Sequence, residues 1–99
     1  MKVDVPGQGK VIGFYGADHQ SLVACEELGE LIRAVSKMRR AAAAGSDDWD
    51  AYENLVEEIA DVLIVLEQLQ EMYEIPNHAI QSVVFQKCAR QEERMYESV

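Results

Sequence analysis

The chain has 99 residues, 48% of them hydrophobic and 27% charged, a balance typical of one globular domain rather than of a disordered chain. Its formal net charge of −9 argues against attraction to a phosphate backbone, so we expect no nucleic-acid partner. The longest apolar stretch, near residues 59–66, is interrupted by Asp61 and is too short to cross a bilayer, which predicts no membrane partner and a cytoplasmic location.

The first 17 residues contain four glycines and Pro6. This composition predicts an irregular N-terminal arm over residues 1–17, with a short extended piece at Val11 to Tyr15. The rest of the chain, residues 18–99, reads as a single helical domain. Neither Cys25 nor Cys88 has the spacing of a zinc site or of a disulfide framework, so we expect reduced, mostly packed thiols.

A first long helix is predicted from Asp18, a suitable N-cap, to the region of Gly45, a suitable C-cap. Apolar residues recur along it with the spacing of an amphipathic helix, at Leu28, Leu31, Ile32 and Val35. We expect this stripe to face the core.

Ser46, Asp47 and Asp48 can cap a second long helix, predicted from about Trp49 to Tyr73. Its expected core stripe consists of Leu55, Ile59, Val62, Leu66 and Leu69. Because residues 63–65 are also apolar, the middle of this helix is apolar nearly all round, which indicates burial on several sides. Three helices could hardly cover it, so we infer a homo-oligomer, either a dimer or a tetramer.

Pro76 fits the first turn of a third helix that runs to about Met95, with Ile80, Val83 and Val84 facing inward. No strand pattern competes with these helices. The predicted fold is therefore all-α, an antiparallel helical bundle whose core is completed by homo-oligomerisation.

Two pairs of carboxylates stand at helical spacing on the first two helices. Glu27 and Glu30 share a face of the first helix, and Glu58 and Asp61 share a face of the second. A short connection makes these helices antiparallel neighbours, so the pairs can meet and bind Mg²⁺, with Mn²⁺ as a substitute. Any one of these acids could be an ordinary solvated side chain, but Asp61 lies in the run IADVLIVL, where an unpaired carboxylate would be costly.

Basic and polar residues continue the same stripes at seven-residue steps. On the third helix Lys87 and Arg94 follow Ile80, and Arg90 lies one turn from Lys87. Phosphate binding and snorkelling at the end of a bundle explain this pattern equally well. Gln20 and Lys37 are further candidates for contacts with the substrate, and the alternative for both is an ordinary surface role. The candidates for stacking on a base are Tyr15, Trp49 and Tyr52, and the alternative for each is simple packing.

The strings EELGE at 26–30 and EEIAD at 57–61 resemble the EExxE and ExxD metal-binding motifs of the MazG-like all-alpha NTP pyrophosphatase superfamily. The resemblance spans residues 18 to 95. It implies Mg²⁺ ligation by Glu27, Glu30, Glu58 and Asp61, and a basic residue on the last helix that contacts substrate, for which Lys87, Arg90 and Arg94 are candidates.

The resemblance implies hydrolysis of an NTP or dNTP to the monophosphate and pyrophosphate, in a role such as nucleotide-pool house-cleaning. Glu26 or Glu57 would then orient the attacking water as a general base. Two alternatives stay open: a phosphoribosyl-ATP pyrophosphohydrolase, and a non-catalytic acidic helical module that dimerises through the stripe from Leu55 to Leu69.

Overall fold

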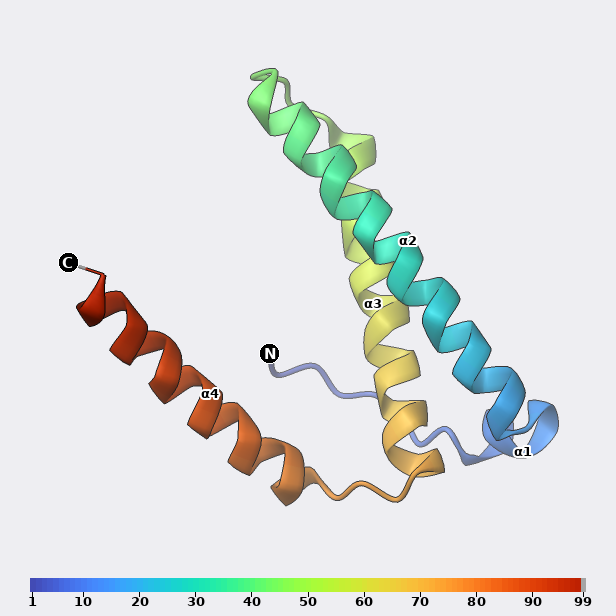
Figure 1. The fold of residues 1–99 in the computed structure, drawn as a ribbon. Helices are drawn as coiled ribbons and strands as arrows, with labels where there is room; N and C mark the ends of the chain where they lie inside the picture. Colours follow the sequence, from blue (N-terminus) through green and yellow to red (C-terminus); the bar gives the residue numbers. More distant parts are fainter. Residues whose placement is uncertain (99) are drawn as a thin grey trace.

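The computed structural model describes residues 1–98, which form four helices: α1 (Gly9–Tyr15), α2 (Ala17–Ala43), α3 (Trp49–Met72) and α4 (Asn77–Glu97). No strand occurs within residues 1–98, so the all-α prediction is confirmed. Residue 99, the end of the expected helical domain, lies outside the described residues. As Figure 1 shows, α2 and α3 form a long hairpin, whereas α4 extends away from it.

The N-terminal arm is more ordered than its composition predicts. The expected extended piece at Val11 to Tyr15 is wrong, because these residues belong to helix α1. Gly16 separates α1 from α2 at φ 91° and ψ 156°, a backbone conformation that residues other than glycine rarely adopt. Gln8 attaches the arm to α3, since its backbone N–H donates to the Glu71 carboxylate at 2.8 Å.

The connection between α2 and α3 is built as the sequence predicts. Gly45 follows the end of α2 at φ 67°, and the N–H of Ser46 reaches back to the carbonyl oxygen of Ala41 at 3.1 Å. These features form a Schellman ending, in which glycine accepts the left-handed position. Asp48 caps α3, its side-chain oxygen accepting the N–H of Ala51 at 2.9 Å.

Small and polar residues, rather than the predicted apolar stripes, form the seam between α2 and α3. The most buried positions are Gln20, Ala24 and Ala34 on α2, and Ala51, Val62, Val65 and Gln68 on α3. The predicted apolar stripe of the first helix is largely exposed, at Leu28, Ile32 and Val35. On α3, Ile59 and Leu66 are exposed too, while Val62 is buried as expected. The hairpin therefore leaves much of its apolar surface uncovered.

Helix α4 does not return to the bundle. Its first residue, Asn77, accepts a hydrogen bond from Gln70, but within residues 1–98 no other helix packs against α4. Ile80, Val83 and Val84 are 42%, 48% and 44% exposed, so the prediction that they face inward is wrong for the single chain. The reason is the connection at residues 73–76, which directs α4 away from the hairpin (Figure 1).

Two further sequence expectations concern exposure. Cys25 and Cys88 are reduced but exposed, so the expected packing of the thiols is wrong. None of the helices in the described part of the chain has a run of residues long and apolar enough to cross a membrane.

Candidate metal centre

Two glutamates of the candidate site occupy core-type positions in the seam. On α2, Glu27 lies midway between the buried residues Gln20 and Ala34, seven residues from each. On α3, Glu58 lies midway between the buried residues Ala51 and Val65 at the same spacing. Since a seven-residue step returns to nearly the same face of a helix, both carboxylates project into the line along which the helices pack.

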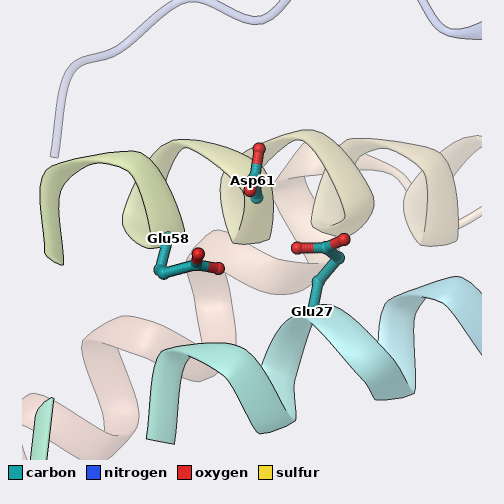
Figure 2. Close-up of side chains that lie close together, drawn as sticks. All are labelled: Glu27, Glu58 and Asp61. Atoms are coloured by element: carbon teal, nitrogen blue, oxygen red, sulfur yellow. The ribbon is translucent and has the colours of Figure 1, made fainter. Parts of the chain in front are cut away.

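This arrangement brings three of the four expected ligands together. Glu27 from α2 meets Glu58 and Asp61 from α3, and one carboxylate oxygen of each lies within 4.8 Å of the others. Figure 2 shows Glu27 on one helix opposite Glu58 and Asp61 on the other. A set of carboxylate oxygens at this separation suits a hard divalent cation.

The negative charges in the cluster act on one another. Burial, followed by the charges of Asp61 and Glu58, raises the pKa of Glu27 above its ordinary value. Burial likewise raises the pKa of Glu58, with the charges of Asp61 and Glu30 adding to the effect. Burial and the neighbouring negative charges therefore make it harder for Glu27 and Glu58 to ionise, a cost that a bound cation would remove.

One oxygen in the cluster lacks any partner. Glu58 Oε2 is buried and accepts no hydrogen bond from the residues that the structure describes. A buried carboxylate oxygen without a donor is unfavourable, and a divalent cation would satisfy it. The apolar run around Asp61 predicts that Asp61 is the buried carboxylate. In the structure Asp61 is partly exposed, and the buried oxygen without a partner belongs to Glu58.

The fourth expected ligand, Glu30, lies at the edge of the cluster. Its carboxylate forms an ion pair with Arg33, one turn further along α2, and both side chains are well exposed. Arg33 also counteracts the rise in the pKa of Glu58. The sequence reasoning missed Arg33, although its three-residue spacing from Glu30 predicts such a pair.

The two candidate general bases, Glu26 and Glu57, are both exposed and stand outside the group of three close carboxylates. They differ in one respect, because the charge of Glu57 contributes to the raised pKa of Glu58. Glu57 is therefore electrostatically coupled to the cluster.

The predicted substrate contacts on α2 lie in different surroundings. Gln20 is buried, and its side-chain N–H donates to Gln68 Oε1 at 2.9 Å. Gln68 in turn donates to Gln8 Oε1 at 3.0 Å, so the three amides link the arm to both helices of the hairpin. Lys37 is exposed.

The basic residues of the last helix are not brought to the carboxylates within one chain. Lys87, Arg90 and Arg94 are all exposed, and they lie on the helix that packs against no other in the described chain. A substrate contact from these residues requires either a movement of α4 or a second copy.

The three candidate stacking residues lie at the two ends of the hairpin. Trp49 and Tyr52 form an edge-to-face pair, with ring centroids 5.6 Å apart, beside a cleft that Met38 and Ala42 also line. Tyr15 stacks on His19 at a centroid separation of 5.0 Å. Stacking on a base stays a prediction for all three.

Comparison with known proteins adds one finding. The family model of the MazG nucleotide pyrophosphohydrolase domain matches residues 18–96, which include all of α3 and nearly all of α2 and α4. No curated protein and no solved structure was found to match the chain.

Proposed function

The chain belongs to the MazG nucleotide pyrophosphohydrolase family, and on this basis we propose that it is a Mg²⁺-dependent hydrolase of nucleoside triphosphates. The proposed reaction converts an NTP or dNTP to the monophosphate and pyrophosphate. The observation that carries the proposal is the meeting of Glu27, Glu58 and Asp61 around the unpartnered oxygen Glu58 Oε2. Nucleotide-pool house-cleaning and a cytoplasmic location are parts of the same proposal.

In this proposal Glu27, Glu58 and Asp61 hold the cation, and Glu30 joins them when it leaves its pair with Arg33. Mg²⁺, or Mn²⁺ in its place, would supply neutralisation of the triphosphate charge and activation of water. Three carboxylates alone would repel an anionic substrate, so a cation is needed before the site can accept one.

The bond that breaks joins the α-phosphorus to the oxygen that bridges to the β-phosphorus. The oxygen of a water molecule forms the new bond to the α-phosphorus, and pyrophosphate leaves. The water must lose a proton to a general base, and we favour Glu57 over Glu26 for this role. Glu57 is electrostatically coupled to the cluster but is not one of its three close carboxylates. Lys87 and Arg94, with Arg90, would balance the charge of the departing phosphates.

The decisive test is pyrophosphate release from a panel of canonical and modified NTPs and of phosphoribosyl-ATP, with Mg²⁺ and with a chelator. We expect hydrolysis only with the metal, and a loss of at least about a hundredfold in Asp61→Ala. Glu53→Ala is the matched control, because Glu53 is an exposed acid of the same helix outside the cluster. Equal activity of Asp61→Ala and wild type would disprove the site assignment.

The same panel separates the alternatives. Turnover of phosphoribosyl-ATP with none of the NTPs would identify the other pyrophosphohydrolase activity. A chain that hydrolyses nothing, and whose stability Mg²⁺ does not change, would instead be the non-catalytic dimerisation module.

A further inference from the structure

The nine basic residues of the chain are unevenly placed around the metal centre. Helix α3, which supplies Glu58 and Asp61, contains none of them. Three lie on α4, which packs against no other helix within residues 1–98, and two belong to the N-terminal arm and α1. The remaining four are on α2, where Arg33 follows Glu30 by three residues. Arg33 is thus the basic residue closest in sequence to a carboxylate of the centre.

The hydrogen bond between Gln20 and Gln68 shows which residues of the two antiparallel helices lie level. Ten residues beyond Gln20 along α2 is Glu30, and ten residues back from Gln68 along α3 is Glu58. Because both helices rise by about 1.5 Å per residue, Glu30 lies at about the height of Glu58. In agreement with this position, the charge of Glu30 contributes to the raised pKa of Glu58.

Glu30 and Asp61 also turn to the same side of the seam. Each follows the seam residue of its own helix, Glu27 or Glu58, by three residues. In an antiparallel pair of helices, equal rotations from the seam lead to the same side. This side is open, since Glu30 is exposed and Asp61 is partly exposed. A phosphate chain that approaches the centre from this side meets Arg33 one turn beyond Glu30.

The pair of Arg33 with Glu30 is the only ion pair within residues 1–98. Its two side chains are 69% and 48% exposed, and a solvent-exposed pair of this kind stabilises a protein little. Either partner can therefore leave it for a stronger one. The charge of Arg33 also opposes the rise in the pKa of Glu58, so its effect extends beyond Glu30 to the cluster itself.

We propose that Arg33 exchanges partners when the site is loaded. Glu30 turns from Arg33 to the divalent cation, and the released guanidinium binds the β- and γ-phosphates of the nucleotide. The planar fork of an arginine matches the oxygens of a phosphate, whereas it is occupied as long as Arg33 holds Glu30. The phosphate ligand rests on the proposed function, but the release of Arg33 from Glu30 by a cation does not.

The first test measures the affinity for Mg²⁺ alone by calorimetric titration, without a nucleotide. Arg33→Gln should bind Mg²⁺ up to about fivefold more tightly than wild type, because Glu30 loses its competing partner. Arg39→Gln is the matched control for the change in net charge, since Arg39 is an exposed cation of the same helix without an ion pair in the described chain. It should have a smaller effect.

A double-mutant cycle shows whether Arg33 acts through Glu30. Glu30→Gln should weaken Mg²⁺ binding, because it removes a ligand. In this background Arg33→Gln should change the affinity no more than Arg39→Gln does. The exchange would be overturned by an equal effect of Arg33→Gln with and without Glu30→Gln, or by an equal effect of Arg33→Gln and Arg39→Gln in the wild-type background.

The second test uses tripolyphosphate in the presence of saturating Mg²⁺ as a probe of phosphate recognition. Arg33→Gln should bind it at least about tenfold more weakly, and kcat/KM for NTP hydrolysis should fall by a similar factor. Arg33→Lys should recover part of the loss, because it keeps the charge but not the planar fork. Tighter Mg²⁺ binding together with weaker phosphate binding is the expected result, and an ion pair that only stabilises α2 would produce neither.

The two proposals fail in different ways. Unchanged tripolyphosphate affinity and unchanged kcat/KM in Arg33→Gln would overturn the role of Arg33 and leave the proposed function in place. A wild-type protein that hydrolyses no nucleotide would disprove the proposed function. The Mg²⁺ titrations would then still decide whether Arg33 and the cation compete for Glu30.

Discussion

Replacing Glu58 by Gln tests the metal centre most directly. The substitution keeps the size of the side chain but removes one negative charge from the group of three, and it replaces the carboxylate, which has a buried oxygen without a partner, by a neutral amide. Two opposite effects should follow. Without metal, the protein should become more stable, because the substitution removes a charge whose burial, together with repulsion from Asp61 and Glu30, raises the pKa of Glu58. With Mg²⁺, the variant should gain little.

The size of the second effect follows from binding linkage. At a Mg²⁺ concentration about 100 times its Kd, wild type gains about 2.7 kcal/mol, which for a domain of this size raises Tm by roughly 10–20 °C. Loss of a ligand should weaken binding by at least about a hundredfold, which lowers the gain to about 0.4 kcal/mol and the rise in Tm to roughly 2–3 °C.

The assay is thermal unfolding followed by circular dichroism, in chelator and across a Mg²⁺ titration, on wild type, Glu58→Gln and Glu53→Gln. The last variant removes the same charge from an exposed position of α3 and should respond to Mg²⁺ as wild type does. A Mg²⁺-induced rise in Tm that is equal in Glu58→Gln and wild type would refute the assignment of Glu58 to the centre.

Three further predictions concern stability. The pKa values of Glu27 and Glu58 are raised above 4.5 in the folded chain, so folding favours their protonated forms. Protonation of the two carboxylates therefore contributes to the free energy of unfolding. This contribution is complete below the unfolded pKa and is lost as pH rises through the folded pKa. Denaturant unfolding in chelator should therefore show this contribution falling as pH rises above 4.5, with a smaller fall in a Glu27→Gln/Glu58→Gln variant. Equal pH dependence in the two proteins would contradict the coupling. Gln68→Leu should cost about 1–3 kcal/mol because it leaves the buried side-chain N–H of Gln20 without its acceptor. Gln20→Leu/Gln68→Leu should cost less than the two single changes added together, which urea titrations can check. Glu74→Gly should stabilise the chain by about 1 kcal/mol because φ 53° is unfavourable for any side chain, and an unchanged midpoint of unfolding would show that the strain is absent.

Local signals in the sequence predicted the helices well. Asp48 caps α3 as its position before the helix predicts, and Gly45 ends α2 in the left-handed conformation that glycine adopts most easily. The arm was mispredicted, because Gly9 and Gly13 suggested an irregular chain where α1 forms. Glycine opposes a helix only weakly, and tertiary contacts such as the bond from Gln8 to Glu71 can outweigh it.

The packing faces were harder to predict, since periodicity identifies an apolar face but not its partner. The stripe that includes Leu28 and Ile32 is predicted to face the core. The two helices of the hairpin instead pack along Ala24, Ala34 and Ala51, and the apolar stripe stays exposed. Small residues let two helices approach closely, so they can form the seam although a hydrophobic pattern favours another face.

Residue spacing is enough to identify the carboxylates that could form a metal centre, because a three-residue step places Glu27 with Glu30 and Glu58 with Asp61 on one face of any helix. Which of these carboxylates meet depends on how the helices pack. The seam draws in Glu27 and Glu58 with Asp61, buries an oxygen of Glu58 rather than of Asp61, and leaves Glu30 paired with Arg33. The tertiary structure also places the cations of α4 apart from these carboxylates. Residue spacing does not predict this, because the direction of a helix after a turn depends on backbone angles and hydrogen bonds.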